Sequence, residues 1–188
     1  MARYKKKKPR IFTLITVVII SALLAAFLTP ALRLVYPLDY LDEIERYSKE
    51  YDLDKYLVMG IISTESGFDV DAESHKEAKG LMQVKDDTAL WCVEHFNMDI
   101  SESDILSPES NIRIGCAYVR YLKDRYEGNT LTAIAAYNAG PGNVDKWLSQ
   151  PRYSDGGTTL NTIPFAETAE YVKKVQKRAK IYKKLYER

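Results

Sequence analysis

The 188-residue chain has few of the residues that mark several classes of protein. It contains only two cysteines, nine glycines and seven prolines, and its formal net charge is only +1. Two cysteines exclude a disulfide-dense scaffold, and so few glycines and prolines exclude a collagen-like chain. Disorder as the overall state is excluded by a hydrophobic content of 46%, because disordered chains are less apolar and more strongly charged. The length suits one domain with a buried core.

The chain also lacks the short motifs of several common active sites. It has no glycine-rich phosphate loop, no HExxH, no CxxC and no GxSxG, and its two histidines lack metal-ligand spacing, so no metal or cofactor is expected. Cys92 and His95 are three residues apart, which could suggest a thiol peptidase. A buried cysteine beside a surface histidine is the simpler interpretation, because no third group nearby would orient the pair. For Cys92 and Cys116, a disulfide and two buried thiols both stay open.

Charge is unevenly distributed along the chain. Residues 1–36 hold seven basic side chains and no acidic one, whereas residues 37–188 carry a formal charge of −6. Nucleic-acid binding needs basic residues on the folded surface, where they can neutralise phosphates. The acidic body therefore argues against a nucleic-acid partner.

Residues 11–28 form a run without charge, proline or glycine. As a helix, this run would extend about 27 Å, close to the hydrocarbon thickness of a bilayer. We expect a transmembrane helix over residues 11–28, with the basic residues 1–10 in the cytoplasm and the rest of the chain outside. Residues 29–36 would link it to a domain over residues 37–188. A cleaved signal peptide is the alternative, but its apolar region is usually shorter, and Thr29-Pro30-Ala31 is a poor cleavage site.

The pattern over residues 37–188 predicts an all-α domain. Apolar residues recur every three or four positions, and no alternation of period two is sustained, so a sheet of any size is not expected. We expect helices over residues 38–51, 55–66, 87–96, 108–126, 131–139, 143–150 and from 164 to the C-terminus, three of them capped by Asp54, Ser107 and Thr130. The helix over residues 55–66 is apolar all round in its middle and is therefore predicted to be central.

Glu65 stands out among the acidic residues because of its place near the end of that apolar helix. A carboxylate at the negative end of a helix dipole is unfavourable, and burial at the edge of an apolar core raises the pKa of a carboxyl group. Such a group can stay protonated near neutral pH and act as a general acid. An ordinary surface glutamate is the alternative interpretation, which the unfavourable placement weakens.

Three further clusters follow the segment Glu65-Ser66-Gly67-Phe68. They are GLMQV at 80–84, AYNAGPG at 136–142 and PFAETAEYV at 164–172, and between the four lie Ser74, Thr88-Ala89, Asn111-Ile112 and Gly115. In this order and at these separations, the clusters resemble the lytic transglycosylases of the soluble, lysozyme-like type, over about residues 38–185. The resemblance implies an all-α, lysozyme-like catalytic domain of the goose-type lysozyme and transglycosylase superfamily.

The resemblance also implies roles for individual residues. Glu65 corresponds to the single catalytic acid/base of the family. The positions that bind substrate or border the catalytic glutamate are Ser74, Gln83, Tyr137, Asn138, Glu167 and Tyr171. Two departures bear on the sugar preference: Lys85-Asp86 stands where Met or Thr followed by Pro is common, and Asp69 stands where Asn is usual.

The implied reaction is cleavage of the β-1,4 bond between N-acetylmuramic acid and N-acetylglucosamine in bacterial peptidoglycan. The C6 hydroxyl of the muramic acid would attack its own C1 and form a 1,6-anhydro sugar, with no metal or cofactor. The resemblance implies peptidoglycan glycan strands as the partner. From the apolar run and the location it predicts, we also expect contact with the membrane through residues 11–28 and with a machine that crosses the cell wall. A lysozyme-like hydrolase of the same bond and a non-catalytic wall-binding scaffold are the alternatives.

Overall fold

The computed structural model describes residues 10–187, and the chain divides into two units, Met1–Leu38 and Asp39–Arg188. The first unit holds helix α1 (Arg10–Val35), which includes Pro30 and continues through most of the expected linker. Large apolar side chains of α1, among them Leu14, Ile19 and Phe27, are exposed. Of the basic segment expected over residues 1–10, residues 1–9 lie outside the described part.

The transmembrane helix expected over residues 11–28 is not confirmed. Within residues 10–187, no helix has both the length and the apolar character that crossing a membrane requires.

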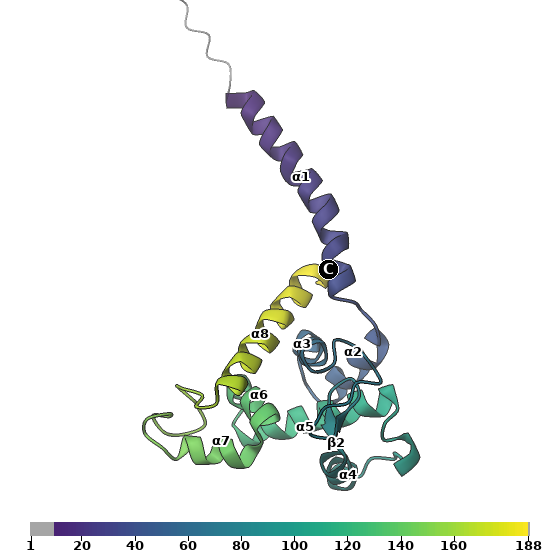
Figure 1. Cartoon of the computed structure of the whole chain (residues 1–188), viewed down its shortest axis with the longest axis vertical. Helices are drawn as coiled ribbons and strands as arrows, with labels where there is room; N and C mark the ends of the chain where they lie inside the picture. The colour runs from purple at the N-terminus through teal and green to yellow at the C-terminus, as the bar shows by residue number, and fades with distance from the viewer. Residues whose placement is uncertain (1–9, 188) are drawn as a thin grey trace, which may run out of the picture. The chain divides into compact units, whose positions relative to one another are not determined.

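The second unit is a helical domain with one very small hairpin (Figure 1). Its elements in chain order are α2 (Leu41–Glu50), α3 (Lys55–Glu65), β1 (Ala78–Lys79), β2 (Val84–Lys85), α4 (Asp86–His95), the 3-10 helix η1 (Glu102–Asp104), α5 (Pro108–Arg125), α6 (Thr130–Ala139), α7 (Pro141–Leu148) and α8 (Ala166–Tyr186). Strands β1 and β2 are antiparallel, with Ala78 opposite Lys85. The predicted all-α class is confirmed, because a hairpin of two-residue strands is not a sheet of any size.

The helix ends follow capping chemistry, with one correction. Asp54 accepts a hydrogen bond from the main-chain N–H of Tyr56, and Ser107 caps α5 in the same way, as predicted. The predicted cap Thr130 is wrong: it is the first residue of α6, and the side chain of Asn129 accepts from the N–H of Thr132. Both residue types form good caps, and the one that precedes the first helical turn takes the role.

Helix α3 lies at the centre of the domain, as its apolar sequence predicts. All its residues from Leu57 to Ser63 are buried, and its contact with α8 is the most extensive between helices of the described chain. A Cβ atom at Gly60 would lie 2.8 Å from the carbonyl oxygen of Val175 and 3.0 Å from the main-chain nitrogen of Ala179. The missing side chain therefore allows the backbones of α3 and α8 to approach closely.

We predict that Gly60→Ala destabilises the domain by about 1–3 kcal/mol, because the added methyl group forces the two backbones apart. The loss is measured by urea unfolding. Gly142→Ala in α7 is the matched control: apart from its chain neighbours and its own helix backbone, no atom lies within 4 Å of the position of its Cβ, so stability should stay the same or rise by up to about 1 kcal/mol. Equal stability of both variants would show that the close contact at Gly60 is not required.

Candidate active site

Glu65 is the last residue of α3, and its side chain is half-buried. Burial raises the pKa of its carboxyl group to about 7. The hydroxyl of Tyr171 on α8 donates a hydrogen bond of 2.5 Å to Oε1 of Glu65, which opposes part of this rise because it stabilises the carboxylate. At neutral pH, the carboxyl group is therefore divided between its protonated and charged forms.

Residues 80–83 of the GLMQV segment form the turn between β1 and β2, and two polar side chains fix it. Asn111 of α5 is buried; it accepts from the N–H of Met82 at 2.7 Å and donates to the carbonyl oxygen of Lys79 at 3.0 Å. The hydroxyl of Ser66, next to Glu65, donates to the carbonyl oxygen of Leu81 at 2.9 Å. The turn is thus held at a set position beside the end of α3.

Gln83 belongs to this turn and has a positive φ of 50°. Its side-chain NH2 group donates to the carbonyl oxygens of Ala72 at 2.8 Å and Gly80 at 3.0 Å. The NH2 group therefore holds the loop in place, and its carbonyl oxygen accepts no hydrogen bond from the described residues. Any contact of Gln83 with a ligand would use that oxygen as an acceptor.

Tyr137 and Asn138 lie in the last turn of α6. The hydroxyl of Tyr137 donates to the carbonyl oxygen of Met82 at 2.7 Å, and the side-chain oxygen of Asn138 accepts from the hydroxyl of Thr168 at 2.8 Å. Burial raises the pKa of the Tyr137 hydroxyl far above its ordinary value, so it stays protonated and acts as a donor. Of the two tyrosines among the predicted site residues, Tyr171 contacts Glu65, whereas Tyr137 is bonded to the turn.

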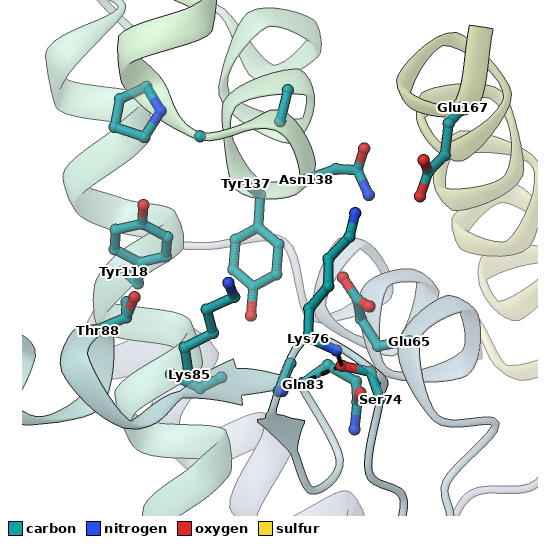
Figure 2. Close-up of a pocket in the computed structure, with 15 residues that line it drawn as sticks. Glu65, Ser74, Lys76, Gln83, Lys85, Thr88, Tyr118, Tyr137, Asn138 and Glu167 are labelled. Atoms are coloured by element: carbon teal, nitrogen blue, oxygen red, sulfur yellow. Dashed lines mark hydrogen bonds between the residues drawn. The ribbon is translucent and has the colours of Figure 1, made fainter. Parts of the chain in front are cut away.

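These elements surround a pocket of about 570 Å³. It is lined by Glu65, Ser74, Lys76, Ala78, Gln83, Val84, Lys85, Thr88, Tyr118, Tyr137, Asn138, Ala139, Gly140, Pro141 and Glu167. Figure 2 shows the carboxyl group of Glu65 facing the space below Asn138, with Glu167 of α8 at the border. Six of the seven predicted site residues are thus brought together, while Tyr171 does not line the pocket and contacts Glu65 instead.

Sequence reasoning missed a second pocket of about 300 Å³, lined by Asp87, Thr88, Trp91, Tyr118, Tyr121 and Pro141. It shares Thr88, Tyr118 and Pro141 with the first pocket, so the two adjoin. The rings of Trp91 and Tyr121 are 4.8 Å apart, and those of Tyr118 and Tyr137 are 5.6 Å apart. The spacing of Tyr118 and Tyr121, three residues apart on one helix, is the signal that could have indicated this aromatic extension.

The two cysteines are free and buried. Burial raises the pKa of Cys92 to about 12, so its thiol carries almost no thiolate at neutral pH and is a poor nucleophile. The ring of His95 stacks on Trp91 at 4.5 Å. Among residues 10–187, no group of three His, Cys, Asp or Glu is placed to hold a metal ion.

Comparison with known proteins agrees with this geometry. The family model described as the transglycosylase SLT domain matches residues 42–158. The soluble lytic murein transglycosylase of Salmonella typhimurium is 36% identical over 159 residues, covering 83% of this chain and 25% of that protein. The membrane-bound lytic murein transglycosylase C of Edwardsiella ictaluri is 34% identical over 172 residues, covering 78% of this chain and 47% of that protein.

The fold matches solved structures as well. An inactive mutant of lytic transglycosylase Slt from Pseudomonas aeruginosa superposes with a TM-score of 0.73 at 34% identity, covering 81% of this chain and 25% of the other. The chain thus spans about a quarter of the length of its soluble relatives. With more than half of its residues matched by the family model, the chain belongs to the transglycosylase SLT domain family.

Proposed function

We propose that this chain is a lytic transglycosylase that cleaves the β-1,4 bond between N-acetylmuramic acid and N-acetylglucosamine in peptidoglycan. The observation that carries the proposal is the half-buried carboxyl group of Glu65, with its pKa raised to about 7, at a pocket of about 570 Å³. A general acid works best when its pKa lies near the working pH. The names of the relatives, which are lytic murein transglycosylases, support the same reaction.

In the proposed mechanism, protonated Glu65 gives its proton to the glycosidic oxygen as the C1–O bond breaks. The Glu65 carboxylate then accepts the proton of the C6 hydroxyl of muramic acid, whose oxygen attacks C1 of the same sugar. The products are a 1,6-anhydro sugar and a free hydroxyl group on the leaving strand, and Glu65 regains its proton. An intramolecular nucleophile held in place can contribute about 7–11 kcal/mol, so a second carboxylate is not required.

The surrounding residues have separate proposed roles. Tyr171 positions Glu65 through its hydrogen bond, and Tyr137 holds the turn that carries Gln83. The free carbonyl oxygen of Gln83 and the side-chain amide of Asn138 would bind the acetamido groups of the sugars, and Ser74 and Glu167 would border the strand. Glu167 is the second carboxyl group of the pocket, and a lysozyme-like hydrolase would need such a group to activate water.

We predict that Glu65→Gln lowers cleavage of purified peptidoglycan by about 10²–10⁴-fold, because the amide cannot donate and recover the proton. The measurement is mass spectrometry of the released fragments. The wild type should release anhydro ends, each one water lighter than a reducing end. Reducing ends would instead favour the hydrolase, and equal inactivity of wild type and variant would favour the wall-binding scaffold.

Two controls accompany this variant. Glu94→Gln makes the same change at an exposed site outside the pocket and should keep full activity.

Unfolding at pH 8 tests the fold: Glu65 has its pKa raised from 4.5 to about 7, so its ionisation destabilises the wild type as pH rises through this interval. Glu65→Gln should therefore be more stable than the wild type at pH 8, by about 1–3 kcal/mol, and similar below pH 4.5. A less stable variant at pH 8 would mean that Glu65 is structural.

The pH profile is expected to report the hydrogen bond between Tyr171 and Glu65. Activity should fall above about pH 7, as the general acid loses its proton. Tyr171→Phe removes a hydrogen bond that stabilises the Glu65 carboxylate, so the pKa of Glu65 should rise. The fall in activity at alkaline pH should then occur about one pH unit higher than in the wild type. Tyr137→Phe, which removes a bond to Met82 instead, should leave this fall at the same pH. A downward shift in Tyr171→Phe would contradict the assignment.

We also propose that residues 11–28 attach the chain to a membrane, with the domain over residues 37–188 on the extracytoplasmic side, where it could serve a machine that crosses the wall. The uncharged run and the exposed apolar side chains of α1 support this proposal. A cationic residue at the centre of a membrane helix costs about 2.5–3.5 kcal/mol.

Ile19→Lys combined with Leu23→Lys should therefore move much of the protein from the membrane fraction to the soluble fraction. Leu90→Lys, at an exposed apolar residue of α4, should not change the distribution. The two fractions are compared by immunoblot after salt washing. Unchanged sedimentation of the double variant would refute attachment through this helix.

A further inference from the structure

Two lysines that no proposed step uses, Lys76 and Lys85, line the pocket beside Glu65. Both are exposed, and neither forms an ion pair with any described residue. Their neighbour Lys79 differs, because its ammonium group pairs with Asp86 at 2.8 Å. The hairpin side of the pocket therefore carries two lysines whose ammonium groups form no ion pair with any described residue.

The backbone holds the two lysines at the same edge. Lys85 is the last residue of β2 and lies opposite Ala78 in the hairpin. Lys76 lies two residues before β1, in a loop where the hydroxyl of Ser74 accepts hydrogen bonds from the N–H groups of Lys76 and Ala78. Figure 2 shows the side chain of Lys85 extending towards Tyr137 and that of Lys76 towards Asn138, across the pocket from the hairpin.

This local positive charge contrasts with the rest of the domain. Residues 37–188 carry a formal charge of −6, which would repel an anionic strand as it approaches. Among the described residues that line the pocket, the acidic side chains are Glu65, which is partly protonated at neutral pH, and Glu167 at the border. Two cations in such a pocket favour a ligand that carries negative charge at this edge.

We propose that Lys76 and Lys85 recognise a carboxylate group of the substrate strand, so that the pocket selects anionic over neutral glycan. The inference rests on the proposed function, in which the strand contains muramic acid. Muramic acid offers carboxylates from two sources: its own lactyl group on bare strands, and the peptide linked to that group on substituted strands. The recognition chemistry is the same for both. Each exposed ion pair should strengthen binding by about 1.4- to fivefold.

The test uses the full chain carrying Lys76→Gln and Lys85→Gln together, with two matched variants. Lys76→Arg with Lys85→Arg keeps both charges and should bind like the wild type. Lys180→Gln with Lys184→Gln makes the same change in net charge on exposed residues of α8 outside the pocket, and should also have no effect.

The probes are soluble, fluorescently labelled glycan strands in four forms: bare or peptide-bearing, each with free carboxylates or with carboxylates capped as methylamides. Dissociation constants are measured in a Glu65→Gln background, so that binding is read without cleavage. KM and kcat are measured in parallel with Glu65 intact.

We expect the variant with Lys76→Gln and Lys85→Gln to have Kd and KM values for uncapped strands that are higher by about threefold or more. Its kcat should stay within about twofold of the value for the protein with both lysines. Capped strands should bind both proteins equally. If affinity falls only for bare uncapped strands, the lysines recognise the lactyl carboxylate. If it falls only for peptide-bearing uncapped strands, they recognise a carboxylate of the peptide. An equal loss on capped and uncapped strands, or no loss, overturns the proposal.

Failure of the proposed function gives a different result. If the protein with Glu65 intact releases no anhydro ends from any strand, the reaction is wrong. The binding measurements in the Glu65→Gln background still decide whether the two lysines select carboxylates.

Discussion

The close contact of α3 with α8 is the constraint on which the site depends. Gly60 allows the two helix backbones to approach, and the same pair of helices supplies Glu65 and Tyr171, which are 106 residues apart in the chain. A small separation of the helices would lengthen the 2.5 Å hydrogen bond between these side chains and admit water to the carboxyl group. The stability of the core and the protonation of Glu65 are therefore linked through one helix contact.

The electrostatics of Glu65 result from two opposing effects. Burial raises the pKa of the carboxyl group, and the Tyr171 hydroxyl lowers it by a smaller amount, leaving a value of about 7. A group poised at this value can give a proton and take one back at neutral pH with little penalty in either direction. This property suits a reaction in which one residue serves as acid and then as base, with the nucleophile supplied by the substrate.

The sequence predicted the helical class and the residues that gather at the pocket, but it misjudged some local details. Asn129 and Thr130 are both good capping residues, and only the path of the chain into α6 selects Asn129. The sequence also did not indicate that the NH2 group of Gln83 binds the carbonyl oxygens of Ala72 and Gly80, which leaves its side-chain oxygen for a ligand. The adjoining aromatic pocket was not anticipated, since its residues come from α4, α5 and the start of α7.

The sequence alone was enough to predict where the helices lie and to single out Glu65 as the candidate acid. Hydrophobic periodicity, capping and the helix dipole each depend on residues close together in the chain, so a sequence pattern contains them. Which side chains meet around Glu65 was decided by packing between distant segments. That packing paired Tyr171 with Glu65, bonded Tyr137 to Met82, and left Lys76 and Lys85 at the pocket without an ion pair to any described residue. These outcomes depend on how closely α3, α6 and α8 approach, and a linear pattern of residues does not contain that distance.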